Sequence, residues 1–268
     1  MKKYFLTIYL IIFCASSHGQ GMKEAIESFN IGKYPETAQI LSSIKPSTPK
    51  SNGFLCQLYA EEKISPDREI SKQVCDDAVF AKDPVAVYTY ALAYIYGNDA
   101  LQIPINEKKG LGFMAVTAID LDFSPAFDFF CEKYFLEKKY NTAVNFCKVA
   151  AHKGLRKSLH RMSLFYSEGL GVIQNFEKSK QLMLASAALN YAPAYEYLGD
   201  AAKEGKNGYI LDLRHAYAWY SLSAAIKSDN QTQEKRKALK IADDDVLIAQ
   251  KMAAEWKYKN PKLIDYYK

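Results

Sequence analysis

A short motif that recurs along the chain constrains its fold more than any other feature. The motif Leu-Gly-x-x-Ala-x-x-Gly at residues 198–205 is matched at residues 162–169, 36 residues earlier, and at residues 90–97, a further 72 residues upstream. Two degenerate copies, which begin at Leu55 and Phe130, lack the final glycine. A period in the mid-thirties predicts stacked helical hairpins, because a single hairpin is too small to bury its own apolar face.

A second motif, of small and aromatic residues, follows each copy of the first. Ala-x-x-Trp-Tyr-x-x-Ser-Ala at residues 216–224 is matched at residues 180–188, 143–151 and 110–118, and residues 71–79 form the most degenerate copy. This alignment puts a leucine at position 184 in the column of the second aromatic residue. Spacings of three, four and seven residues place the conserved columns on one helical face, so we expect them to pack in the core.

Together the two motifs resemble the SEL-like repeat family, a branch of the tetratricopeptide-like helical solenoids. The usual form in that family is L-G-x-x-Y-x-x-G, a short glycine-containing loop and A-x-x-W-Y-x-x-A-A, which residues 198–224 match best. The resemblance covers about residues 52–258, and together with the first residues of the chain, described below, it indicates an exported bacterial member of the family. It also implies an all-α, right-handed superhelical solenoid of antiparallel helical hairpins that binds other proteins.

Caps, breakers and periodicity divide the chain further. Residues 45–52 hold two prolines and several small polar residues and form the clearest linker. The predicted domains are a signal peptide (1–19), an N-terminal tetratricopeptide-like hairpin (20–44), the linker (45–52), the SEL-like repeat array (53–231) and C-terminal capping helices (232–268). Helices are expected at residues 22–31, 35–43, 53–63, 67–81, 84–96, 107–121, 125–137, 140–153, 156–167, 176–190, 193–204, 212–226, 232–241 and 244–258.

The first residues are typical of a secretory signal. Lys2 and Lys3 precede an apolar stretch at residues 4–13, and small residues follow, so we expect cleavage after Gly19. The stretch has about half of the roughly 20 residues needed to cross a bilayer, so a permanent membrane span is not expected. A bulky residue before Cys14 disfavours lipid attachment there. We therefore expect an exported protein, periplasmic or secreted.

The charge balance argues against nucleic-acid binding. The formal net charge is +5, from 35 basic and 30 acidic residues spread along the chain. Nucleic-acid-binding proteins normally concentrate basic residues on one stripe or face. The densest basic run, Lys235-Arg236-Lys237, is interpreted as a solvated helix face.

The four cysteines beyond the signal occupy repeated columns. Cys56 and Cys131 share one column of the first helix, and Cys75 and Cys147 share one column of the second. Residues equidistant from the turn of an antiparallel hairpin face each other, and both midpoints fall in predicted turns. The repeat thus selects disulfides Cys56–Cys75 and Cys131–Cys147 from three possible connectivities, and export would favour their oxidation. The alternative is four buried free thiols. We expect no metal site, because there is no C-x-x-C and the histidines are scattered.

Two short strings resemble part of a serine-enzyme set. Residues 47–50 fit S-x-x-K and residues 228–230 fit S-D-N, whereas K-T-G is absent. The first string holds a proline and is expected in a loop, where the Ser and Lys would not be aligned. We predict no catalytic residues and no cofactor. The alternative function is a penicillin-binding or β-lactamase-type hydrolase, since some cysteine-rich SEL-like relatives have been linked to penicillin binding.

The resemblance also suggests a binding surface. In tetratricopeptide-like arrays the first helices line the concave face. The residues two before and two after the Leu of the first motif point toward it, and so does the residue before the motif's last position. Mapping that rule gives Tyr88, Leu92, Tyr96, Asp128, Glu132, Leu136, His160, Leu164, Glu168, Glu196, Asp200 and Glu204. The surface begins aromatic and apolar and becomes acidic, so the expected partner is a protein with a basic, partly apolar segment. We predict an exported scaffold or adaptor that binds another envelope or extracellular protein. The alternative is that these are ordinary solvated positions.

Overall fold

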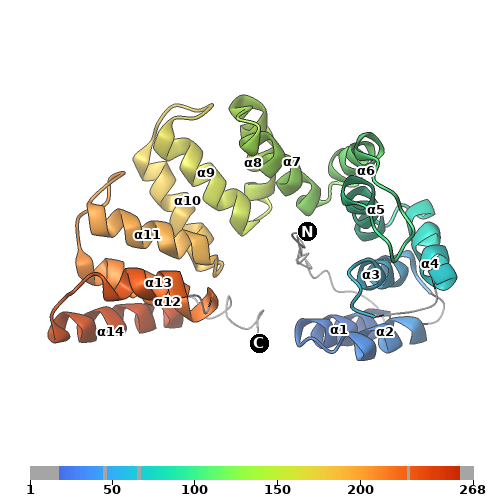
Figure 1. Ribbon diagram of the computed structural model, residues 1–268, viewed down its shortest axis with the longest axis horizontal. Coiled ribbons are helices and arrows are strands. Elements are labelled where there is room, and N and C mark those ends of the chain that lie inside the picture. Colours follow the sequence, from blue (N-terminus) through green and yellow to red (C-terminus); the bar gives the residue numbers. More distant parts are fainter. Residues whose placement is uncertain (1–17, 45–46, 65–67, 228–229, 260–268) are drawn as a thin grey trace. The chain divides into compact units, whose positions relative to one another are not determined.

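The computed structural model describes residues 18–44, 47–64, 68–227 and 230–259 (Figure 1). The regular structure of these segments is α-helical, with one isolated antiparallel β-bridge between Asn98 and Ile103. Residues 1–17 of the expected signal peptide lie outside the described residues. None of the described helices combines the length and the apolar character that a bilayer crossing requires. The predicted all-α repeat solenoid is confirmed.

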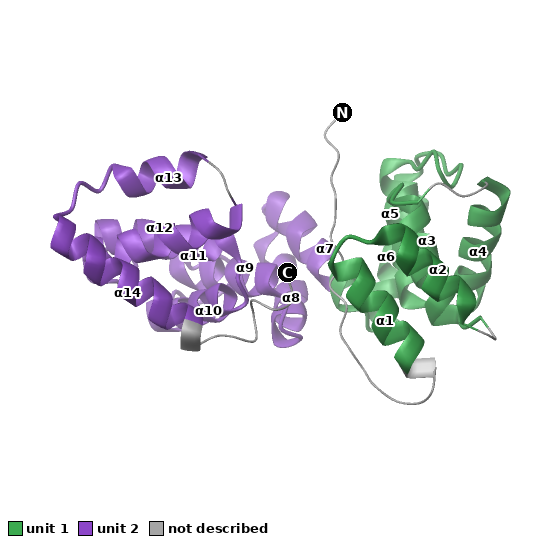
Figure 2. Ribbon diagram, turned by 90° about the horizontal axis from the view of Figure 1, so that it is seen from below, with its two compact units in different colours: residues 1–126, 267–268 green, residues 127–266 purple. Residues whose placement is uncertain are grey.

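The chain forms two compact units, which meet in sequence between Ala126 and Phe127 (Figure 2). The first unit contains α1 (His18–Asn30), α2 (Tyr34–Ser43), α3 (Pro49–Ala60), α4 (Arg68–Phe80), α5 (Pro84–Tyr96) and α6 (Glu107–Ile119). The second contains most of α7 (Ser124–Leu136), followed by α8 (Tyr140–His152), α9 (Arg156–Glu168), α10 (Phe176–Ala188), α11 (Ala192–Glu204), α12 (Leu213–Lys227), α13 (Asn230–Lys237) and α14 (Asp243–Lys259). Each helix expected from the sequence is present.

The start of α3 differs from the expectation. Thr48 is its N-cap, and the Thr48 hydroxyl accepts a hydrogen bond from the backbone N–H of Ser51 at 3.1 Å. The Ser51 hydroxyl in turn accepts one from the backbone N–H of Thr48 at 3.0 Å, which completes a capping box. Pro49 occupies the first turn, where its missing N–H costs nothing. The expected linker therefore ends at the cap, four residues before residue 52.

The repeat columns pack as the spacing predicted in the hairpin of α11 and α12. Gly199 on α11 and Tyr220 on α12 are both buried. A Cβ atom at Gly199 would lie 2.5 Å from the ring of Tyr220, closer than real side chains approach. The glycine of the first motif is thus required because the second aromatic residue of the partner helix lies directly against its backbone.

One column assignment was wrong by a single residue. On α10 the buried residues include Ser179 and Met183, whereas the alignment had put Leu184 in the buried column. The loop between α9 and α10 spans residues 169–175, and the loop between α11 and α12 spans residues 205–212. Because the first loop is one residue shorter, a constant 36-residue offset shifts the second helix of that hairpin by one position.

In the hairpins α3–α4 and α7–α8, a pair of cysteines occupies the repeat positions that Gly199 and Tyr220 occupy in α11–α12. The sulfur atoms of Cys56 and Cys75 are 2.14 Å apart, and those of Cys131 and Cys147 are 2.07 Å apart. All four side chains are buried. Both predicted pairs are therefore at disulfide distance, and each links the two helices of one hairpin across its core.

Candidate partner-binding surface

The structure divides the twelve predicted surface residues into buried, engaged and exposed groups. On α5, Tyr88 is fully buried and its ring meets that of Phe123 edge-on, with centroids 5.5 Å apart. Tyr88 is therefore a core residue, which corrects the prediction that it faces a partner. Leu92 is half-buried, and Tyr96 at the end of the helix remains 55% exposed.

The two acidic positions of α7 face an arginine of the next hairpin. Asp128 is buried and accepts a hydrogen bond from the Ser158 hydroxyl. The Arg161 guanidinium lies 3.5 Å from the Asp128 carboxylate and 2.9 Å from that of Glu132. Hydrogen-bonded carboxylates that already share a cation cannot act as free acidic contacts for a partner. The acidic surface expected on α7 is thus largely satisfied within the chain.

The two predicted positions in the middle of α9 are also packed. The His160 ring lies edge-on to Tyr191 at 5.4 Å and to Tyr197 at 6.4 Å. Burial, together with the charge of Arg161, lowers the pKa of His160 to about 4, so its side chain is neutral near pH 7. Leu164 packs against the apolar cluster of the following hairpin. Neither residue offers an open contact.

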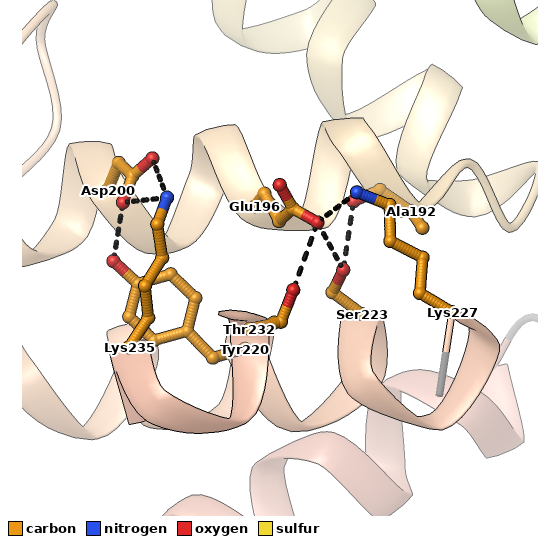
Figure 3. Close-up of polar contacts among 8 residues, drawn as sticks. All are labelled: Ala192, Glu196, Asp200, Tyr220, Ser223, Lys227, Thr232 and Lys235. Atoms are coloured by element: carbon orange, nitrogen blue, oxygen red, sulfur yellow. Dashed lines mark hydrogen bonds and ion pairs between the residues drawn. The ribbon is translucent and has the colours of Figure 1, made fainter. Parts of the chain in front are cut away.

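On α11, Glu196 is engaged by the two helices that follow it (Figure 3). One of its carboxylate oxygens accepts hydrogen bonds from the Ser223 hydroxyl at 3.2 Å and the Thr232 hydroxyl at 3.1 Å. The same oxygen lies 2.5 Å from the Lys227 ammonium. Ser223 and Lys227 belong to α12 and Thr232 to α13, so one carboxylate joins three helices.

Asp200, one turn along α11, repeats this arrangement (Figure 3). It accepts a hydrogen bond from the Tyr220 hydroxyl at 2.6 Å and lies 2.8 Å from the Lys235 ammonium. Burial and the bond to Asp200 raise the pKa of Tyr220. The guanidinium of Arg236 lies over the ring of Tyr217, 5.6 Å from its centroid. The basic run of α13 is therefore not simply a solvated face, because its first two residues contact α11 and α12.

One repeat column remains accessible on the first helices α5, α7, α9 and α11. These residues, which we call the helix-end positions, are each the last residue of their helix: Tyr96, Leu136, Glu168 and Glu204. Leu136 is 71% exposed, and Glu168 is exposed. Glu204 is also exposed, with its carboxylate 2.6 Å from the Lys206 ammonium. The helix-end positions are the part of the predicted surface that hairpin packing leaves open.

Sequence reasoning missed a second set of exposed apolar residues. They lie in the loops that join the two helices of a hairpin: Ile105, Ile173, Ile210 and Leu211. Each comes one to two residues before the polar residue that caps the second helix, and this spacing could have revealed them. The columns of the two motifs do not include these loop positions.

The sequence strings that suggested a serine enzyme can now be placed in part. Ser47 precedes the N-cap of α3, and Lys50 lies in its first turn with its side chain exposed. The expected loop around this string is therefore partly a helix start. Ser228 and Asp229 of the second string lie outside the described residues. Among the residues that the structure does describe, no group of three potential metal ligands comes together.

Solved structures of repeat proteins resemble this chain, and two of them are described here. The first is c5321, a protective antigen present in uropathogenic Escherichia coli strains and displaying an SLR fold, with a TM-score of 0.72 and 16% identity over 90% of this chain and 53% of the antigen. The second is a Sel1 repeat protein from Oxalobacter formigenes, with a TM-score of 0.65 and 20% identity over 87% of this chain and 98% of that protein. The fold is that of the SEL-like repeat proteins. This chain thus spans about half of the antigen's length. No protein-family profile and no curated protein matches the sequence.

The SEL-like fold accounts for the division of the predicted surface. Stacked SEL-like hairpins contact their neighbours along the first helices, so positions in the middle of those helices are used for packing between repeats. The helix-end positions keep a large part of their side chains exposed. A solenoid of stacked hairpins presents an extended surface, and among the twelve predicted positions the helix-end positions are the most exposed part of it.

Proposed function

We propose that this protein is an exported scaffold that binds another protein through the helix-end positions of its SEL-like hairpins. The observation that carries the proposal is that Tyr96 and Leu136 occupy the same repeat position and are 55% and 71% exposed. Hairpin packing does not require large apolar side chains at this position. Exposed aromatic and aliphatic residues that become buried on association are the usual anchors of protein interfaces.

The chemistry of the proposed partner follows from the same column. In the second unit, Leu136 would contact an apolar part of the partner and Glu168 a basic part, and Tyr96 offers a further apolar contact on the first unit. A partly apolar, basic segment of a protein fits this chemistry. Asp128, Glu132, Glu196 and Asp200 are not part of the proposed surface, because their carboxylates already have partners within the chain.

The compartment is part of the proposal. Two buried cysteine pairs at disulfide distance are expected in a protein that folds in an oxidising environment such as the periplasm or the cell exterior. The mass of the mature protein isolated from cell fractions tests this. Cleavage after Gly19 and recovery outside the cytoplasm are expected, and an uncleaved cytoplasmic chain would contradict export.

Site-specific photocrosslinking in the native cell tests the surface. A photoreactive phenylalanine analogue replaces Tyr96 or Leu136, and a matched control replaces Phe80, which is 91% exposed at the end of a second helix. We expect the same protein to be captured from both helix-end positions and not from Phe80. Capture should be lost when Leu136→Glu is added to the Tyr96 probe. No capture, or equal capture from all three positions, would contradict the proposed surface.

A further inference from the structure

The helix α13 lacks the apolar residues that normally hold a helix in place. Its sequence is Asn-Gln-Thr-Gln-Glu-Lys-Arg-Lys, and Thr232 is its one buried residue. An isolated helix of eight residues is unstable in water, so contacts with the rest of the chain must keep α13 helical. Leu239, two residues after the helix, is buried against the last hairpin and anchors one end. Polar contacts position the rest.

Those polar contacts match two side chains on α13 with two on α11. Thr232 and Lys235 are three residues apart and therefore share one helical face. They meet Glu196 and Asp200, which are four residues apart on α11, through a hydroxyl–carboxylate hydrogen bond of 3.1 Å and an ion pair of 2.8 Å (Figure 3). Tyr220 completes the surface by donating a hydrogen bond to Asp200 at 2.6 Å.

The equivalent acidic positions earlier in the array are engaged by a following repeat. Asp128 and Glu132 occupy the same columns as Glu196 and Asp200, and Arg161 of the next first helix binds both. No further SEL-like first helix follows α12 among the described residues. In its place α13 supplies a lysine to Asp200 and a hydroxyl to Glu196, whose cation is Lys227 of α12. The last hairpin thus has an acidic surface that takes a basic helix.

The ion pair between α13 and Asp200 is more exposed to solvent than the ion pair between Arg161 and Asp128. The Lys235 and Asp200 side chains remain 33% and 45% exposed, whereas those of Arg161 and Asp128 are 13% and 12% exposed. Solvent-exposed ion pairs contribute little to stability, because water and salt screen them. Helices with few buried apolar contacts open at low free energy without global unfolding. The structure therefore provides an acidic surface with an occupant that can leave.

We propose that the surface formed by Glu196, Asp200 and Tyr220 binds a basic helical segment of a partner protein, and that α13 occupies this surface in the unbound chain. The fitting segment carries a hydroxyl residue three positions before a lysine, as Thr232 precedes Lys235. A partner must displace α13, so the intact chain binds such a segment more weakly than a chain in which α13 is detached. The proposal extends the proposed scaffold function to a second contact on the last hairpin.

Hydrogen exchange of the full-length protein tests the contact itself. Lys235→Glu places a negative charge against Asp200, and Lys240→Glu is the matched control, since Lys240 is exposed and lies three residues beyond the end of α13. We expect amide exchange in α13 to rise at least tenfold in Lys235→Glu and to stay within twofold of wild type in Lys240→Glu. Exchange in α9 should be unchanged in both. Unaltered protection of α13 in Lys235→Glu would overturn the proposal.

Binding of a labelled peptide tests the surface. The probe is an acetylated peptide of residues 230–240, and the same peptide with Thr232→Val and Lys235→Glu is its control. We expect the probe to bind full-length Lys235→Glu at least tenfold more tightly than wild type, and addition of Asp200→Asn to abolish the gain. Equal binding to both chains, or none to Lys235→Glu, would overturn the proposal. Both experiments use the isolated protein, so their outcome is independent of whether Tyr96 and Leu136 capture a partner.

Discussion

Removing the Cys131–Cys147 link should strongly destabilise the hairpin of α7 and α8. The two residues are 16 apart in sequence and both are buried. In the chain-entropy treatment, closing a loop of this size stabilises the folded state by about 3 kcal/mol at 25 °C. Cys131→Ala/Cys147→Ala also removes two buried sulfur atoms, which places the total loss in the range of about 3–5 kcal/mol. A loss of this size is a large part of the stability of a typical domain.

Peptide mapping without reduction is the first step of this experiment. Trypsin cleaves between the cysteines of each pair, so each link should join two peptides. The expected products join residues 51–63 to residues 73–82, and residues 110–133 to residues 140–148. Free thiols or any other pairing would refute the assignment before stability is measured.

Urea unfolding and hydrogen exchange then measure the effect. The link acts within one hairpin, and repeat arrays are stabilised locally, so exchange should accelerate mainly in α7 and α8. Cys56→Ala/Cys75→Ala is the matched variant and should instead affect α3 and α4, which it links. Reductant should destabilise the wild type and have no effect on a variant without the four cysteines. A Cys131→Ala/Cys147→Ala chain as stable as wild type would refute the reasoning.

Two further predictions concern packing and pH. Gly199→Ala should lower the free energy of unfolding by about 1–3 kcal/mol, because its Cβ would overlap the Tyr220 ring. A Cβ at Gly112 meets nothing within 4 Å, so Gly112→Ala should raise the free energy of unfolding by about 0.4–1 kcal/mol. Similar urea midpoints for the two variants would contradict the packing account. The folded pKa of His160, about 4, lies below its ordinary 6.5, so its contribution to stability is complete above pH 6.5 and is lost as pH falls toward 4. This contribution amounts to at most about 3 kcal/mol, and His160→Gln should flatten the acid limb of stability against pH. An unchanged acid limb would show that His160 is not buried in its neutral form.

Much of the fold could be predicted because helical hairpins are local structures. The columns that hold Gly199 and Tyr220 predicted which residues pack, and the placement of the four cysteines in those columns predicted the pairs now at disulfide distance. The error at Leu184 arose because a loop one residue shorter moves the second helix relative to a fixed period. The repeat pattern describes each helix well and loop lengths poorly.

The binding surface was predicted less well, because the exposure of a residue depends on contacts with other helices, which its position within the repeat does not reveal. Tyr88 has the spacing of a surface residue, yet its ring packs against that of Phe123, which immediately precedes α7. Glu196 and Asp200 are acidic in the sequence, yet residues 20 to 36 positions later supply their hydrogen bonds and cations. Contacts at such separations depend on how one hairpin follows another.

The sequence by itself determined the helices, their pairing into SEL-like hairpins and the pairing of the cysteines. These properties follow from the periodicity of the apolar and small residues, which acts within about 40 residues. The tertiary structure alone decided which polar side chains are available to a partner. Arg161 of a following hairpin pairs with the carboxylates of Asp128 and Glu132, and α13 pairs with Asp200 on the last hairpin. The ends of the first helices, represented by Tyr96 and Leu136, remain exposed.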